Sequence, residues 1–286
     1  MSSCPWIRNG DSIMSRLTVR KTYKLFIGGA FPRSESGRSY IVTSGKVEVN
    51  AARASRKDAR DAVGAARKAF AGWSGATAYN RGQILYRIAE MLEGRRAQFA
   101  DEMGGKKASI DAAVDRLVWY AGWSDKIAAV HGSANPVAGP YFNLSSPEPT
   151  GVVAVVAPKD PLLGLVSVIA PVIVTGNTCV VVTESPLPSI TFAEVLATSD
   201  LPGGVVNILT GHQAELAPWL SSHMDVNGLD LTGVTDPDLA LTCEQAAAEN
   251  LKRVLRPRRE DWAADPGLSR MTSFLETKTV WHPVGV

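Results

Sequence analysis

Three cysteines, Cys4, Cys179 and Cys243, are the strongest candidate nucleophiles in this sequence of 286 residues. A cysteine thiolate can attack a carbonyl carbon and carry a covalent intermediate. Cys4 precedes the first periodic segment, and we interpret it as an idle thiol. Cys179 lies in a β-branched run that predicts a buried strand, whereas Cys243 lies in a predicted helix. Their number and spacing indicate neither a disulfide framework nor a zinc site, so we predict no metal site.

Charged clusters are the other candidates for chemistry. The segment GGKK (104–107) follows no predicted strand and lacks the GxxxxGK[ST] spacing of a phosphate-binding loop. We interpret it as a helix end, with glycines terminating the helix and lysines at its negative pole. The arginines of RPRR (256–259) favour a solvated loop over an anion site. Asp160 follows an apolar run and is interpreted as a turn residue rather than a general base.

Four short apolar runs are expected to position these residues. They span 151–157, 178–182, 205–210 and 228–232, and the segments between them, 162–175, 188–199 and 212–222, are long enough for crossover helices. Alternating strands and helices predict an α/β fold, a parallel sheet with helices on both faces. Such a sheet commonly holds a nucleotide at the carboxyl ends of its strands.

Further segments flank this predicted sheet. Ser55 can cap a helix that ends near Trp73, and a second amphipathic helix is predicted from 80 to about 99. Residues 136–150, rich in proline and serine, indicate an extended crossover into the sheet. Near the C-terminus, 277–281 alternates as a strand with no obvious local partner, and the helix before it begins near Gly267. Residues 1–22 show no period and are predicted to be a mobile extension.

Composition excludes several classes of protein. Hydrophobic residues make up 45% and charged residues 20% of the chain, and the net charge is +2. These values are ordinary for a globular protein and give no reason to expect nucleic-acid or anionic-membrane binding. No apolar run reaches membrane-spanning length, and the N-terminus lacks the apolar centre of a signal peptide. The default expectation is a cytoplasmic protein.

Five segments of the central region match one known family in amino-acid sequence and in order. They are GVVAVVAP (151–158), IAP (169–171), GNT (176–178), DLPGGVVNILTG (200–211) and SHMDV (222–226). Together they resemble the cofactor domain of the aldehyde dehydrogenase superfamily, as do KLFIGGAFP (24–32) and WYAGWSDKI (119–127). The resemblance implies a Rossmann-like NAD(P)-binding domain over 23–260, followed by a C-terminal helix and oligomerisation strand over 261–286.

The resemblance also implies where catalytic residues should stand. The family uses a cysteine nucleophile, an asparagine that donates to the oxyanion and a glutamate base that activates water. Here Asp160 stands in place of the asparagine, and loss of one oxyanion donor costs roughly 10²–10³ in rate. Arg256 stands in place of the glutamate, and no cysteine maps onto the nucleophile. The resemblance therefore implies a member without catalytic residues.

The positions that would contact NAD(P) are also altered. Val182, or Thr183 with a shifted gap, falls where the family has a ribose-contacting lysine. In the pyrophosphate turn LTGVTDPD (231–238), Val234 removes a hydroxyl, while Asp236 and Asp238 add carboxylates that should repel a diphosphate. Cofactor binding is therefore doubtful. The positions that the resemblance assigns to the cofactor are Pro158, Lys159, Val182, Glu184, Gly211, Gly233 and Thr235.

One branch of the superfamily shares these departures. The second, non-catalytic unit of aldehyde dehydrogenase 16-type proteins is similar to NLKRV (250–254) and KTVWHPVG (278–285). Resemblance to this unit implies a non-catalytic structural or regulatory subunit. Because residues 266–281 resemble the C-terminal end of the family, we interpret the chain as a shortened version whose catalytic domain is excised, with the ends rejoined between about 259 and 267. Its implied partner is a second copy of itself or an intact aldehyde dehydrogenase. The alternatives are an active aldehyde dehydrogenase with rewired residues and a decayed gene fragment.

Overall fold

The central element is a five-stranded sheet, seen in a computed structural model that describes residues 21–44 and 47–285. Its strands are β5 (Val152–Val156), β6 (Thr178–Thr183), β7 (Val206–Thr210), β8 (Gly228–Asp230) and β9 (Arg253–Leu255). All neighbours pair in parallel, in the order β7-β6-β5-β8-β9. The predicted α/β fold with a parallel sheet is confirmed.

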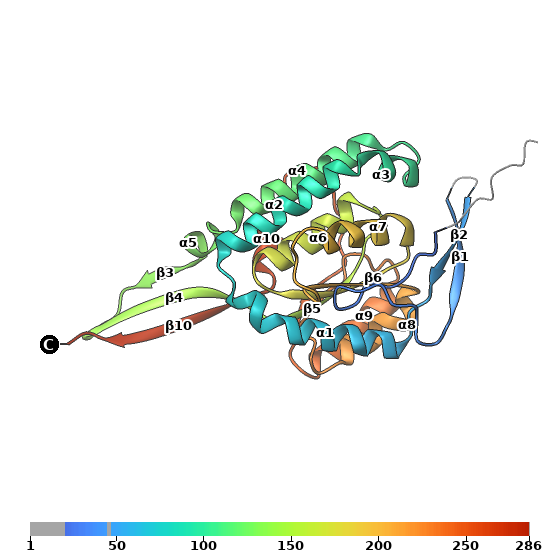
Figure 1. Cartoon of the computed structure of the whole chain (residues 1–286). Helices are drawn as coiled ribbons and strands as arrows, with labels where there is room; N and C mark the ends of the chain where they lie inside the picture. Colours follow the sequence, from blue (N-terminus) through green and yellow to red (C-terminus); the bar gives the residue numbers. More distant parts are fainter. Residues whose placement is uncertain (1–20, 45–46, 286) are drawn as a thin grey trace, which may run out of the picture.

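Helices cover both faces of this sheet (Figure 1). One face carries α6 (Leu163–Val174) and α7 (Pro186–Ala197), over which α2 (Ala78–Gly94) and α4 (Lys107–Trp123) pack. The other carries α1 (Arg56–Gly75), α8 (Gln213–Ser222) and α9 (Pro237–Ala248). Successive strand residues point to opposite faces, so Val153 and Val155 join one apolar core and Val152 and Ala154 the other.

Before the sheet, the structure differs from the prediction in the helix expected over 80–99 and in the lysines that follow it. The hairpin β1 (Ser39–Ser44) and β2 (Val47–Ala52) precedes α1, which begins at the predicted Ser55 cap. The predicted helix over 80–99 is instead divided, because α2 ends at Gly94 and α3 (Arg96–Glu102) follows. Gly104 and Gly105, with φ of 65° and 86°, end α3 as predicted. The following lysines were placed wrongly, since Lys107 begins α4 at its positive pole.

A three-stranded antiparallel arm projects from this body (Figure 1). It follows α5 (Ile127–His131) and consists of β3 (Ser133–Asn135), β4 (Tyr141–Pro149) and β10 (Leu275–Pro283). The predicted crossover over 136–150 is therefore largely strand. The predicted C-terminal strand has no local partner but a distant one in the same chain, because β10 pairs with β4 along its whole length after the short α10 (Ser269–Thr272). The order β10-β4-β3 leaves β10 at an edge of the arm.

Two asparagines, Asn177 and Asn227, hold the amino ends of the strands together. Asn177, just before β6, accepts a hydrogen bond from the Gly151 nitrogen at 2.8 Å. Its amide nitrogen donates to the carbonyl oxygen of Phe274 at 2.9 Å, just before β10. Asn227, just before β8, accepts from the Val152 nitrogen at 3.0 Å. These contacts join the start of the sheet to the base of the arm.

Candidate functional site

The candidate site is the carboxyl edge of the sheet, where ligands bind in this class of fold. Asp160 lies just beyond β5, and its Oδ1 accepts hydrogen bonds from the backbone nitrogens of Leu162 at 3.2 Å and Gly164 at 2.9 Å. These are donors at the start of α6, which would otherwise have no partner within the helix. The side chain therefore stabilises a helix start, as its interpretation as a turn residue predicts.

The end of β6 offers little to a nucleotide. Val182 is fully buried in the apolar core between the sheet and helices α1 and α8. Thr183 is 2% exposed, and its hydroxyl lies 3.2 Å from that of Ser189. Glu184 is exposed, and its carboxylate accepts from the Gln213 nitrogen at 3.1 Å, directly after Gly211 and His212. Of the positions proposed around this strand end, Glu184 and Lys159 reach solvent.

Close packing requires a glycine at position 233, in the turn between β8 and α9. A Cβ on Gly233 would lie 2.1 Å from the carbonyl oxygen of Ala157, so only glycine fits against the end of β5. Val234 is buried, whereas Thr235 is exposed. Asp236 caps α9 by accepting from the Asp238 nitrogen at 3.0 Å. Two carboxylates thus occupy the first turn of the helix whose N-terminus would hold a pyrophosphate.

Arg256 lies just beyond β9 and forms part of the same edge. Its guanidinium is 3.0 Å from the carboxylate of Glu244 on α9, and 77% of its side chain is exposed. A hollow of about 360 Å³ lies between them and the turn after β8, with Pro257 on its wall. An exposed arginine remains protonated and cannot act as a base. The structure agrees with the predicted solvated loop.

Neither described cysteine reaches this edge. Cys179 lies inside β6 and is fully buried, and burial raises the pKa of its thiol. Cys243 is fully buried on α9, and burial likewise raises its pKa. A raised pKa disfavours the thiolate that nucleophilic attack requires. Cys4 lies outside the described residues, and no group of three or more potential metal ligands exists within the described part of the chain.

A second hollow, of about 410 Å³, lies at the carboxyl edge between the α3–α4 turn and the start of α7. Glu102 lines it, and one carboxylate oxygen accepts from the hydroxyls of Tyr23 at 3.1 Å and Thr191 at 2.7 Å. Burial raises the pKa of Glu102, although these hydrogen bonds oppose the shift. Lys106 and Glu184 complete its charged lining. The lining holds acids, an ammonium group and apolar side chains but no thiol.

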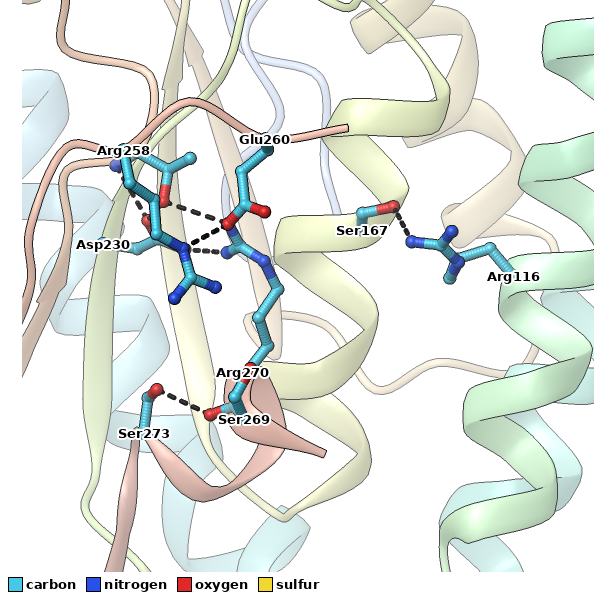
Figure 2. A network of polar contacts seen from close by, with 9 residues as sticks. Arg116, Ser167, Asp230, Arg258, Glu260, Ser269, Arg270 and Ser273 are labelled. Atoms are coloured by element: carbon cyan, nitrogen blue, oxygen red, sulfur yellow. Dashed lines mark hydrogen bonds and ion pairs between the residues drawn. The ribbon is translucent and has the colours of Figure 1, made fainter. Parts of the chain in front are cut away.

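Sequence reasoning missed a buried network beside α6 (Figure 2). Arg270 donates to Asp230 at 2.9 Å and to Glu260 at 2.7 Å, and the exposed fractions of Arg270 and Asp230 are 5% and 1%. On α4, Arg116 donates to the hydroxyl of Ser167 at 2.8 Å. These partners are 40, 10 and 51 positions apart, so no local spacing could have indicated the network.

Comparison with known proteins supplies the remaining evidence. A sequence profile of the aldehyde dehydrogenase family matches residues 33–256. Mouse retinal dehydrogenase 2 is 34% identical over 252 residues, which cover 82% of this chain and 48% of the relative. Human aldehyde dehydrogenase 1A1 is 33% identical over 260 residues, which cover 85% of this chain and 51% of the relative. The chain therefore spans about half the length of these curated relatives.

Solved structures agree with the sequence matches. The NAD⁺ complex of an aldehyde dehydrogenase from Bacillus cereus superposes with a TM-score of 0.75 at 27% identity. The match covers 82% of this chain and 50% of the solved one. Among the described residues, no helix is long and apolar enough to cross a membrane.

Proposed function

This chain belongs to the aldehyde dehydrogenase family, and we propose that it is a non-catalytic structural or regulatory subunit that assembles through its arm. The observation that carries the proposal is the position of the thiols. Both described cysteines are buried in the body of the fold, away from the carboxyl edge. Aldehyde oxidation in this family needs a cysteine thiolate that can reach the substrate. A rewired enzyme that used a described thiol would have to expose Cys179 or Cys243, and each is packed in an apolar core.

The remaining chemistry at the edge supports the same proposal. Asp160 uses its Oδ1 to accept from the start of α6, and an ionised carboxylate has no hydrogen to donate to an oxyanion. Arg256 stands at the family's base position and pairs with Glu244. The described site thus contains neither the donor nor the base that deacylation and hydride transfer would need.

The residues at the edge do not fit a tightly bound NAD(P). Val182 points into the core, and Asp236 and Asp238 place carboxylates where a diphosphate would lie. We therefore expect an NAD⁺ dissociation constant above about 1 mM, which corresponds to less than about 4 kcal/mol of binding free energy. Calorimetry with NAD⁺ and NADP⁺ tests this expectation. Micromolar binding of either cofactor would contradict it.

The short connection between β9 and α10 supports an internal excision of the catalytic domain. The family match ends at Arg256, and the chain covers 50% of the solved relative. Only residues 256–268 connect β9 to α10. Resemblance of the last residues to the second unit of aldehyde dehydrogenase 16-type proteins is in keeping with a subunit of this kind.

The arm supplies the surface for assembly in this proposal. Residues paired across strands lie on the same face of a sheet, which places Leu144 beside Val280 and Phe142 beside His282. On this face Phe142 is 50% exposed and Leu144 is 41% exposed. On the opposite face, the side-chain amide of Asn135 donates to the side-chain oxygens of Asn143 and Ser145. An exposed apolar face beside the unpaired edge of β10 is suited to contact with another chain.

The occupant of this face is a second copy of the chain or an intact aldehyde dehydrogenase. We expect the purified chain to scatter light as an oligomer, and Phe142→Ser with Leu144→Ser to shift it toward monomer. Leu241→Ser is the matched control, because Leu241 is 55% exposed on α9, outside the arm. A wild-type monomer that also fails to bind an intact aldehyde dehydrogenase would contradict the proposal. Truncation within β10 is a poorer test, because it removes the partner of β4.

A further inference from the structure

The segment between β9 and the arm crosses the point where the strand order of the sheet reverses. Strand β5 pairs with β6 on one side and with β8 on the other, so the reversal lies between β5 and β8. Ligands of doubly wound sheets bind outside the carboxyl ends of the strands at this point. In this chain the end of β8 meets the side chain of Arg270, which belongs to residues 257–272, a segment that we call the strap (Figure 2).

Arg270 fixes one end of the strap to the sheet. It donates to the Oδ2 of Asp230, the last residue of β8, at 2.9 Å, and to the hydroxyl of Thr232 at 3.1 Å. Arg270 also donates to Glu260 at 2.7 Å. Both residues belong to the strap, so this contact joins its two ends. The second oxygen of Asp230 accepts from the Thr232 nitrogen at 2.9 Å. The buried charges are therefore paired and hydrogen-bonded.

Arg116 holds the strap from the other side. It lies on α4, is 9% exposed and donates through one nitrogen to the backbone oxygens of Trp262 at 2.8 Å and Ala264 at 2.9 Å. Its other terminal nitrogen donates to Ser167 on α6. A guanidinium presents several donors in a fixed geometry, so one side chain can join α4, α6 and the strap. Two buried arginines from different elements thus fix the same segment.

Trp262 lies between these two arginines in the strap. Its ring centre is 5.0 Å from the guanidinium carbon of Arg270, within the range of a cation–π contact. A Cβ placed on Gly164, in the first turn of α6, would lie 3.4 Å from the Trp262 ring and 2.8 Å from the Cβ of Asp160. The indole therefore packs against the helix start that follows β5, beside Asp160.

We infer that the strap closes the α6 side of the switch point with the chain's own side chains, with Arg270 and Arg116 as its fixing points and Trp262 as its cover, while the hollow beside α9 stays open. The inference does not depend on the proposed function, because it concerns the closed state of the strap and not cofactor affinity or assembly. A closed strap distinguishes a chain whose own residues cover the α6 side of the switch point from a fragment in which that side is open to solvent.

Hydrogen exchange of arginine side chains, followed by ¹⁵N nuclear magnetic resonance on the full chain, tests the closed strap directly. In the wild type, the N–H groups of Arg270 and Arg116 should exchange at least about tenfold more slowly than those of Arg259, which is exposed on the strap. The variants Arg270→Lys and Arg116→Lys identify the signals by removing them. Exchange of Arg270 as fast as that of Arg259 in the wild type would overturn the inference.

The Trp262→Ala variant tests the cover. Exchange at Arg270 should accelerate at least about tenfold, because the guanidinium loses the indole that shields it. Arg81 is the internal control, since it donates to the backbone oxygens of Val174 and Ala76 and has no contact with the strap among its described hydrogen bonds. Its exchange should not change. An Arg270 signal that does not respond to Trp262→Ala would also overturn the inference.

Discussion

The two ends of the same parallel sheet differ in what their side chains do. At the amino ends, Asn177 joins Gly151 to Phe274 and Asn227 binds the start of β5, so polar side chains there hold the fold together. At the carboxyl ends, Asp160 caps a helix and Arg256 forms a surface ion pair. Gly151 and Asn177 stand in segments that resemble the family, whereas Asp160 and Arg256 depart from it. The contrast indicates that this chain retains the contacts that stabilise the fold but lacks the side chains that would catalyse the reaction.

A charge placed at position 182 is expected to have the largest effect on the free energy of unfolding. Val182 is fully buried, so Val182→Lys would bury an unpaired ammonium group and should destabilise the fold by about 4 kcal/mol or more. Glu184→Lys, two residues further and exposed, should change stability by less than about 0.5 kcal/mol. Urea unfolding of both variants measures the difference. If Val182→Lys is tolerated and improves NAD⁺ binding, the carboxyl edge is an open cofactor site and the comparison fails.

A methyl group at the amino edge should have the next largest effect. Gly151 has φ of 138°, and a Cβ there would lie 2.2 Å from the Oδ1 of Asn227. Gly151→Ala should cost about 3 kcal/mol or more, from backbone strain and from displacement of Asn227. Gly267→Ala is the control, because its φ is 57° but no atom lies within 4 Å of the added carbon, and it should cost about 1–2 kcal/mol. Equal losses in thermal unfolding would show that the amino edge has no special packing.

The interpretation of Asp160 as a structural residue gives a smaller effect. Asp160→Ala should destabilise the chain by about 1 kcal/mol, because the start of α6 loses its side-chain acceptor. Asp160→Asn retains an acceptor oxygen and should cost less than about half of that. Neither variant should gain activity, although the second restores the residue type of the family. Aldehyde oxidation by Asp160→Asn would place the residue back in a catalytic role.

Protonation of Glu260 at low pH should have the smallest effect on the free energy of unfolding. Burial disfavours the charged form of Glu260, but the hydrogen bond from Arg258 and the charge of Arg270 outweigh it and lower the pKa below its ordinary 4.5. A lowered pKa stabilises the fold above the ordinary value, and this stabilisation is lost as pH falls through the lower folded value. Relative to Glu260→Gln, the wild type should lose up to about 1 kcal/mol of advantage below about pH 4. A pH-independent difference in melting temperature would contradict this.

The sequence predicted the sheet because its signals are local. The β-branched runs at 152–156 and 178–183 are buried on both faces, and such runs indicate parallel strands whatever surrounds them. Cys179 and Cys243 could be placed in a strand and a helix for the same reason. The burial of Val182 follows from the same signal, because it lies in the same β-branched run as Cys179. The pairing of β10 with β4 and of Arg270 with Asp230 joins residues far apart in the chain, and neither has a local signature.

An NAD(P)⁺ reduction assay across aldehydes, with the purified full chain, tests the central claim most directly. The account predicts no formation of NADH or NADPH above the rate without protein, because no described thiol reaches the carboxyl edge and Arg256 stands in place of the base. The assay should use millimolar cofactor, so that weak binding does not conceal turnover. Cofactor reduction that disappears on Cys243→Ala or Cys179→Ala, in variants that remain folded, would contradict it.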